Sequence, residues 1–292
     1  MNIKHSQPPP SVNYHLWNQC NMRCRFCFAK FQNQEGIQSK KHLNKAESLE
    51  LTKILATHFD KVSFVGGEPT LCPWLGDLIK QAKLMGSTTM LISNGSMLSD
   101  NYLKGLDGCL DWIALSLDSV HENINFDLGR SVGEEVYNAS YYQNLSKRIK
   151  NNGIRLKINT VVNALNVDED MSTLIRTISP ERWKIFQVLP IEKQNNGNVE
   201  DLLITEKKFY EFVKRHQILK SYGILVIPET NEMMTGSYAM VDPVGRFFDN
   251  TMGSYHYSCP IIEVGIETSW NEISFSAIQF SRRKGYYNWK RV

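Results

Sequence analysis

The sequence predicts an α/β protein whose parallel sheet curls into a partial barrel. Predicted strands and helices alternate through the middle of the chain, and no internal repeat or low-complexity run interrupts them. This alternation favours parallel strands joined by crossover helices. With 292 residues and 42% hydrophobic content, the chain is long enough to bury a full core. Cysteines and polar residues follow several predicted strands, where barrel proteins place their chemistry.

The expected architecture is a partial (β/α)6 barrel with a C-terminal extension. The barrel core covers residues 11–190 and follows a polar lead-in at 1–10 that ends in three prolines. Residues 191–292 are less periodic, and we expect this extension to close the substrate site. The expected strands are 12–19, 61–66, 88–93, 111–118, 154–162 and 182–189. The expected helices are 45–58, 73–85, 97–107, 137–151, 168–177 and 205–219.

Composition excludes several classes of protein. The formal net charge is only +3, so no broad nucleic-acid surface is expected. No segment has the character of a signal peptide or of a membrane span. Cys72, Cys109 and Cys259 show no disulfide-like spacing, which fits a reducing compartment. We therefore expect a cytoplasmic protein that binds neither nucleic acid nor a membrane.

The first strand leads into a C-x3-C-x2-C run formed by Cys20, Cys24 and Cys27. Three thiolates on one tight loop can hold three irons of a cubane cluster, and the fourth iron then stays open for a small molecule. Phe26 and Phe28 flank Cys27 and would shield such a cluster from water. The alternatives are three buried cysteines or a zinc knuckle, although zinc sites usually have a second paired arm and none is evident.

The second strand ends in Gly66-Gly67-Glu68-Pro69. Two glycines at a strand end allow the backbone to approach a ligand closely, and Pro69 stiffens the turn. An ordinary strand-to-helix turn would also explain the pattern. The position directly after the cysteine loop favours a cofactor role for Gly66, Gly67 and Glu68.

The third and fourth strands add polar groups at the same end of the sheet. Ser93-Asn94-Gly95-Ser96 follows the third strand, and Ser96 is typical of a helix cap. In the fourth strand, alternation places Ser116 and Asp118 on one face and the apolar residues 113, 115 and 117 on the other. The small polar face suits a cofactor inside the barrel.

Four basic residues lie on the second, fifth and sixth predicted strands. They all point into the barrel if the apolar faces of these strands meet the outer helices. These residues are Lys61, Lys157, Arg182 and Lys184, and Asn159 shares the face of Lys157. Unpaired buried cations are costly, so four together require a polyanion, and a triphosphate is the natural candidate. Charges that reach solvent at strand ends are the alternative. The run Arg282-Arg283-Lys284 with Gly285-Tyr286-Tyr287 is either a basic flap or a solvated tail.

The cysteine run and the GGEP turn together resemble the radical S-adenosylmethionine (SAM) superfamily. Within it, the chain resembles the viperin family from residue 11 to about 250, and more loosely to the end. The motifs that carry this likeness are Asn13-Tyr14-His15, Lys61, Gly66-Gly67-Glu68-Pro69, Ser93-Asn94-Gly95-Ser96, Leu128-Gly129-Arg130, Lys157-Ile158-Asn159, 163–171, 182–187, 226–231 and Ser237-Tyr238.

The resemblance implies the radical SAM barrel fold, a [4Fe–4S] cluster, SAM and a specific reaction. Viperins convert a ribonucleoside triphosphate into its 3′-deoxy-3′,4′-didehydro form, a chain terminator used in antiviral defence. A 5′-deoxyadenosyl radical takes the hydrogen from ribose C4′, the 3′-hydroxyl is lost, and one-electron reduction gives the alkene. The implied substrates are CTP, UTP or GTP, and the implied electron donor is a protein such as flavodoxin or ferredoxin.

The resemblance also implies roles for individual residues. The metal ligands are Cys20, Cys24 and Cys27. The SAM-binding residues are Gly66, Gly67, Glu68, Ser116 and Arg130, with Arg130 on the SAM carboxylate. The substrate-binding residues are Asn13, Lys61, Lys157, Asn159, Arg182, Lys184 and Tyr238. Tyr238 is also the candidate catalytic residue, because a phenol there could donate a hydrogen to the product radical; simple packing is its alternative.

Some features depart from the animal viperins. Those proteins carry an N-terminal amphipathic helix and end in a tryptophan, whereas this chain has a short lead-in and Trp289 is followed by three more residues. Pro10 stands where a threonine is usual near the base, which leaves the preferred base open. The likeness is therefore to a prokaryotic-type viperin. A radical SAM enzyme acting on another anion, such as a cofactor precursor, and a non-enzymatic iron–sulfur protein are the alternatives.

Overall fold

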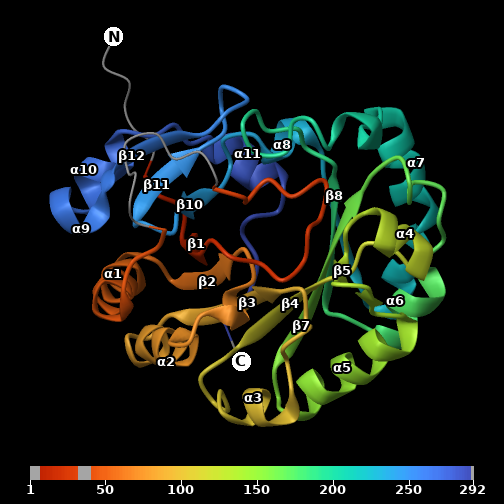
Figure 1. Ribbon diagram of the computed structural model, residues 1–292, viewed down its shortest axis with the longest axis horizontal. Coiled ribbons are helices and arrows are strands. Elements are labelled where there is room, and N and C mark those ends of the chain that lie inside the picture. The colour runs from red at the N-terminus through yellow and green to blue at the C-terminus, as the bar shows by residue number, and fades with distance from the viewer. Residues whose placement is uncertain (1–6, 32–40, 291–292) are drawn as a thin grey trace.

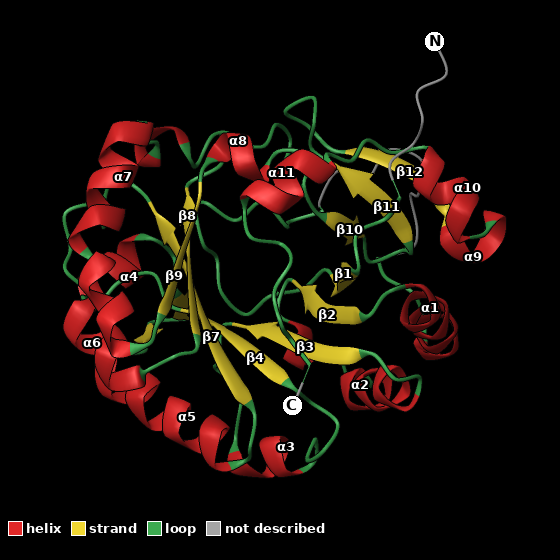
Figure 2. Ribbon diagram, turned by 180° about the vertical axis from the view of Figure 1, so that it is seen from behind, coloured by secondary structure: helices red, strands yellow, loops and turns green. Residues whose placement is uncertain are grey.

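A ten-stranded sheet forms the centre of the protein in the computed structural model, which describes residues 7–31 and 41–290. The first six residues of the expected lead-in therefore lie outside the described part of the chain. The strands are arranged in the order β12-β11-β10-β1-β2-β3-β4-β7-β8-β9. The sheet curves strongly, and Figures 1 and 2 show helices along its outer side.

All six predicted strands form, and they lie next to one another in parallel. They are β1 (Ser11–Trp17), β2 (Lys61–Gly66), β3 (Thr88–Ser93), β4 (Trp112–Ser116), β7 (Arg155–Val162) and β8 (Arg182–Gln187). The expected partial barrel is therefore confirmed. The sheet continues into the predicted extension: β9 (Leu225–Glu229) pairs in parallel with β8, and β10 (Ala239–Val241) pairs in parallel with β1. Strands β11 (Arg246–Asp249) and β12 (His256–Pro260) add an antiparallel edge.

The predicted helices also form, with bounds that differ by a few residues. They are α1 (Lys45–His58), α2 (Leu75–Leu84), α3 (Asp100–Lys104), α5 (Ala139–Asn151), α6 (Ser172–Ile178) and α7 (Glu206–Arg215). Helix α3 is much shorter than the expected 97–107, because the Ser99 hydroxyl caps its start and Gly105 ends it. Past α7, Gln217–Tyr222 continues as a 3-10 helix instead of the expected α-helix.

Several short elements were not expected from the sequence. They are α4 (Glu122–Asp127), the hairpin of β5 (Ser131–Val132) and β6 (Glu135–Val136), α8 (Asn231–Met234), α9 (Ile261–Val264), α10 (Ile266–Asn271), α11 (Ala277–Arg282) and the 3-10 turns Pro69–Leu71 and Glu200–Leu202. Among the described residues, no helix combines the length and apolar character needed to cross a bilayer.

The two faces of the strands separate core from cavity. Ile113, Leu115 and Leu117 of the β4 segment are fully or almost fully buried in the main hydrophobic core. Ser116 and Asp118, on the opposite face, line a cavity inside the curve of the sheet. The alternation in the sequence therefore predicted the inward face correctly for this strand.

Candidate active site

The cysteine loop is fixed by main-chain hydrogen bonds on two sides. The amides of Arg23 and Arg25 donate to the carbonyls of Gly129 and Leu128, at 3.0 and 2.9 Å. On the other side, the Glu68 amide donates to the Gln19 carbonyl at 2.7 Å. Residues near 68 and near 129 thus clamp a loop that has no regular secondary structure of its own, which fixes the position of its thiols.

The glycines after β2 are needed because the backbone of the cysteine loop lies against them. A Cβ atom on Gly67 would lie 2.5 Å from the carbonyl carbon of Gln19 and 3.0 Å from the nitrogen of Cys20. A Cβ on Gly66 would lie 2.5 Å from the Trp17 carbonyl oxygen. The close approach predicted from the Gly-Gly pair is thus made, in this structure, by the chain's own backbone.

We expect Gly67→Ala to destabilise the protein and to reduce cluster loading. The new methyl group must push the cysteine loop away, and such overpacking costs about 1–3 kcal/mol or more. Thermal unfolding and iron content per chain measure the two effects. Gly76→Ala is the matched control, because a Cβ there meets only Leu106 at 3.8 Å inside helix α2. Equal melting temperatures and iron contents in the two variants would contradict the clamp.

Cys20, Cys24 and Cys27 line one cavity of about 260 Å³, and all three are free thiols. Phe26 is buried beside them, whereas Phe28 is 36% exposed and so shields the thiols less than expected. Within residues 7–31 and 41–290, no three His, Cys, Asp or Glu side chains converge to hold a single metal ion, which a zinc site would need. A four-iron cluster takes one thiolate on each of three irons, so this donor set fits it.

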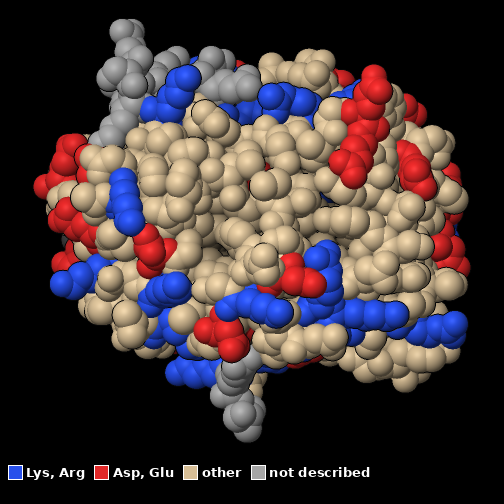
Figure 3. Space-filling view, turned by 60° about the horizontal axis from the view of Figure 1, so that its bottom comes forward, with Lys and Arg blue, Asp and Glu red and all other residues tan. Residues whose placement is uncertain are grey.

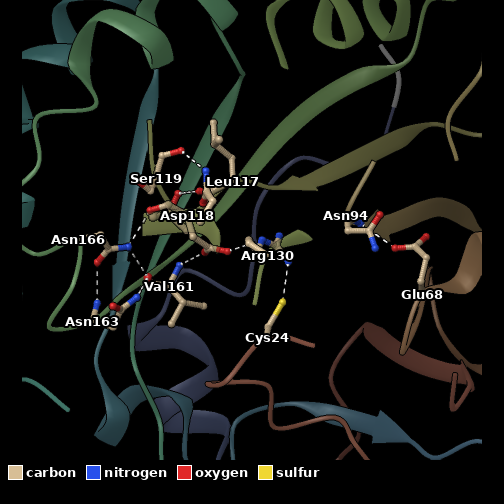
Figure 4. Close-up of polar contacts among 12 residues, drawn as sticks. Cys24, Glu68, Asn94, Leu117, Asp118, Ser119, Arg130, Val161, Asn163 and Asn166 are labelled. Carbon is tan, nitrogen blue, oxygen red and sulfur yellow. Dashed lines mark hydrogen bonds and ion pairs between the residues drawn. The ribbon is translucent and has the colours of Figure 1, made fainter. Parts of the chain in front are cut away.

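Arg130 connects the cysteine loop to the end of β4. Its Nε atom lies 2.7 Å from the Asp118 carboxylate, and its Nη1 atom donates to the Cys24 sulfur at 3.3 Å (Figure 4). Asp118 also accepts from the Val161 amide at 2.7 Å. Although burial lowers the pKa of Arg130, the Asp118 charge outweighs it and the pKa is raised, so the guanidinium stays charged. Its buried Nη2 atom has no hydrogen-bond partner among the described residues, which leaves a donor for a ligand.

The Glu68 side chain is hydrogen-bonded to the last residue of β3 and to residues that follow β2 and β3. Its carboxylate accepts from the Thr70 hydroxyl at 2.6 Å, the Ser93 hydroxyl at 2.8 Å and the Asn94 amide at 2.8 Å. Asn94 in turn donates to the Asn21 side chain of the cysteine loop at 2.8 Å. Glu68 lines the cavity, and Figure 4 shows it facing Asn94. Its oxygens hold the ends of β2 and β3 together.

The predicted basic residues are brought together, and a fifth joins them. Lys61, Lys157 and Lys184 line the cavity and are at most 7% exposed. Arg182 is also buried, but it does not line the cavity; its guanidinium stacks 3.8 Å from the ring centre of Tyr287. Arg283, which the sequence placed in either a basic flap or a solvated tail, is 4% exposed and lines the same cavity. These five residues are called the basic cluster below.

Burial and mutual repulsion change the ionisation of the lysines. Burial, assisted by the Arg283 and Arg182 charges, lowers the pKa of Lys61 to about 7. Burial also lowers the pKa of Lys184 to about 7, although Glu229 opposes the shift. Burial also lowers the pKa of Lys157 well below its ordinary value, and the positive charges of Lys184 and Lys61 lower it further. The cavity therefore favours a ligand that brings negative charge.

Glu229 at the end of β9 is a buried carboxylate that the sequence did not single out. It forms an ion pair with Lys184 and accepts a hydrogen bond from the Tyr238 hydroxyl. Arg283 lies 3.8 Å from the same carboxylate, and its guanidinium stacks 3.5 Å from the centre of the Tyr238 ring. Burial alone would raise the pKa of Glu229, but Lys184 and Arg283 reverse the effect and lower it.

The C-terminal segment lies across the cavity at the amino ends of the strands. The Lys61 ammonium donates to the Tyr287 hydroxyl at 3.1 Å, and Trp112 of β4 donates to the Trp289 carbonyl at 3.0 Å. Trp289 is 6% exposed. In Figures 1 and 2 the chain that follows α11 runs past the strands toward β3 and β4 before the grey residues begin. Tyr287 and Trp289 are therefore packed against the basic cluster, whereas Lys284, Tyr286 and Asn288 of the same segment are exposed.

The cavity is also lined by small polar side chains. Asn13, Asn159 and Ser116 are among them. The buried Oδ1 atom of Asn159 has no hydrogen-bond partner within the described part of the chain. Unsatisfied buried acceptors are rare, so this atom is a candidate contact for a ligand hydroxyl or amine. Every predicted site residue except Arg182 lines the same cavity.

On the face in Figure 3, Lys and Arg side chains lie beside Asp and Glu along the lower part, and a broad area above carries neither charge. The buried basic cluster differs from this face, because its five basic side chains lie with one buried carboxylate, Glu229.

Comparison with known proteins identifies relatives along almost the whole chain. The family model described as the Radical SAM superfamily matches residues 14–178. An S-adenosylmethionine-dependent nucleotide dehydratase of Flammeovirga pacifica is 49% identical, over 96% of this chain and 96% of that protein. The S-adenosylmethionine-dependent nucleotide dehydratase RSAD2 of Oncorhynchus mykiss is 34% identical, over 98% of this chain and 82% of that protein.

A solved structure supports the fold alone. It is described as native anSMEcpe with bound AdoMet and Kp18Cys peptide, and it covers 83% of this chain and 74% of its own. The TM-score is 0.63 at 16% sequence identity. The barrel is therefore shared with a protein whose sequence has diverged widely.

Proposed function

The chain belongs to the radical SAM superfamily and, within it, to the S-adenosylmethionine-dependent nucleotide dehydratases, and from this membership we propose that it dehydrates a ribonucleoside triphosphate. The product is the 3′-deoxy-3′,4′-didehydro analogue of the substrate. The observation that carries this proposal is that three cluster-type thiols and four residues of the basic cluster, Lys61, Lys157, Lys184 and Arg283, line one cavity.

The cofactors are a [4Fe–4S] cluster and SAM, and the residues present fit both. Cys20, Cys24 and Cys27 would hold the cluster, and the free Nη2 donor of Arg130 fits the carboxylate of SAM. Ser116 and the Gly66–Glu68 backbone line the space between them. When bound, the pair supplies an electron and a 5′-deoxyadenosyl radical.

The chain's own residues hold the nucleotide so that its sugar faces the thiols. Lys61 is the first residue of β2 and Arg182 the first of β8, whereas the cysteine loop follows the carboxyl end of β1. A triphosphate bound by the basic cluster therefore occupies the amino ends of the strands. The ribose then lies between Asn13, Asn159 and Tyr238, toward the cysteine loop. The Tyr238 hydroxyl donates a hydrogen bond to the Glu229 carboxylate, which fixes the phenol beside the sugar as a candidate hydrogen donor.

The partners follow from this chemistry. CTP, UTP and GTP are the candidate substrates, and the electron comes from a small reductant protein of the flavodoxin or ferredoxin type. A reducing cytoplasm fits the free thiols. We propose these assignments, and the antiviral use of the product, on the basis of the family membership.

The test is to incubate the reduced, cluster-loaded protein with SAM and each ribonucleoside triphosphate in turn, and to measure 5′-deoxyadenosine. We expect its formation to depend on one triphosphate, together with a nucleotide product lighter by one water. Deuterium at ribose C4′ should appear in the 5′-deoxyadenosine. Absence of triphosphate-dependent 5′-deoxyadenosine with every nucleotide would overturn the proposal and favour a different anionic substrate.

Above neutral pH, the protein should take up protons from solution when it binds the nucleotide. In the free protein, Lys61 and Lys184 have a pKa of about 7 and are largely neutral at pH 8. A bound polyanion favours their charged forms and raises both pKa values, so binding is accompanied by protonation and affinity falls as pH rises from 7 to 9. Calorimetric titration at pH 8 in buffers of different ionisation enthalpy measures this uptake. A binding heat that is the same in all buffers would contradict the prediction.

A further inference from the structure

The carboxylates near the cavity are already committed to other partners. Glu68 and Asp118 are the acidic side chains that line the cavity among the described residues. Glu68 is bonded to Thr70, Ser93 and Asn94, and Asp118 to Arg130 and the Val161 amide. Both carboxylates are thus already engaged by groups of the protein itself.

These carboxylates also lie at the wrong end of the cavity to reach a triphosphate. Glu68 follows the carboxyl end of β2, whereas Lys61 begins that strand. At about 3.3 Å per residue, the strand separates their main chains by roughly 16 Å or more. Glu229 is closer to the basic cluster, but it is fully buried and bonded to Lys184 and Tyr238. It is also outside the residues that line the cavity.

The basic cluster supplies the charge that a metal ion usually supplies. Magnesium nucleotides are commonly held through one or two carboxylates and waters. Here the basic cluster has five buried basic side chains, and two of them, Lys184 and Arg283, lie against the buried Glu229 carboxylate. Five positive charges and one negative charge leave four positive charges when every group is ionised. A nucleoside triphosphate carries about four negative charges near pH 7, because its terminal phosphate has a second pKa near 6. A bound polyanion raises the pKa values of the lysines, so in the complex the two charges match without a divalent cation.

We propose that this enzyme binds its nucleotide as the metal-free polyanion, and that the basic cluster takes the place of Mg²⁺. The inference rests on the proposed function and adds the ionic form of the substrate to it. A Mg²⁺ ion on the phosphates removes two of the four negative charges and competes with the lysines for the same oxygens. The magnesium complex should therefore bind roughly tenfold or more weakly than the free nucleotide.

The test is equilibrium binding of CTP, UTP and GTP to the cluster-loaded protein with SAM, in EDTA and in excess MgCl2. The nucleotide that binds should bind roughly tenfold or more tightly in EDTA than in excess MgCl2 at the same ionic strength. Equal affinity in the two buffers would overturn the inference. Affinity that falls when EDTA removes metal would overturn the inference while leaving the proposed function intact. Absence of binding of every nucleotide in both buffers would instead overturn the proposed function itself.

A variant shows that the measured binding occurs in the cavity. Lys184→Ala should weaken the binding seen in EDTA, because its ammonium lies in the cavity wall. The matched control is Lys53→Ala on the exposed side of helix α1, which should change nothing. Equal binding in EDTA by Lys184→Ala and the wild type would place the nucleotide elsewhere and overturn the inference.

Discussion

Cys24→Ala should give a colourless protein that retains its fold but has lost the cluster and all SAM cleavage. Cys24 is the central thiol of the loop, and the two that remain cannot hold three irons. The loss should be complete rather than partial, because SAM binding needs the open iron of an intact cluster. Iron and sulfide content, visible absorbance and 5′-deoxyadenosine formation are the measurements.

The fold should survive because the loop is clamped mainly through its backbone. The Arg23 and Arg25 amides keep their bonds to Gly129 and Leu128 in the variant. Cys259→Ala is the control, since that thiol is exposed and outside the cavity lining. A Cys24→Ala protein with wild-type absorbance would show that another residue is the third ligand. A far-UV circular dichroism spectrum unlike that of the wild type would show that Cys24 has a folding role.

Lys184→Ala should weaken nucleotide binding by roughly 30-fold or more, while the cluster absorbance survives. Loss of one buried charge partner costs about 2 kcal/mol at the low end of the range for such pairs. Lys184 is nearly fully buried and lines the cavity, so water cannot replace a bound phosphate as the partner of its ammonium group. Equilibrium binding of the triphosphate and the visible spectrum of the same sample measure the two properties.

A second variant separates binding from folding. Removing Lys184 leaves Glu229 buried with Tyr238 and Arg283 as its remaining partners, and an uncompensated buried charge can cost about 3–5 kcal/mol of stability. The double variant Lys184→Ala with Glu229→Gln removes that charge and should recover stability without recovering nucleotide affinity. Loss of cluster and of nucleotide binding together, in both variants, would mean that Lys184 has a folding role only.

The periodicity of apolar residues and the spacing of turn residues and cysteines determined the strands, their inward faces and the loop of thiols. The alternation in residues 112–118 separated apolar from polar faces because each strand needs one face in the core. The spacing of the three cysteines indicated a cluster because only a few coordination chemistries suit three thiolates on so short a loop. Lys61, Lys157 and Lys184 were predicted to face inward for the same reason of alternation, and they line the cavity.

The partners of these groups were decided only by the tertiary structure. Alternation predicts the face of a side chain but not what lies opposite, so the pairing of Lys184 with Glu229 across β8 and β9 could not be foreseen. The same limit applies to Arg182 beneath Tyr287, which lies far along the chain. The Gly-Gly pair predicted a close approach, but the structure alone identified the cysteine loop as what approaches. The sequence thus determined local conformation and the face of the strand on which each side chain lies. Contacts between distant segments depended on how the sheet curls and brings them together.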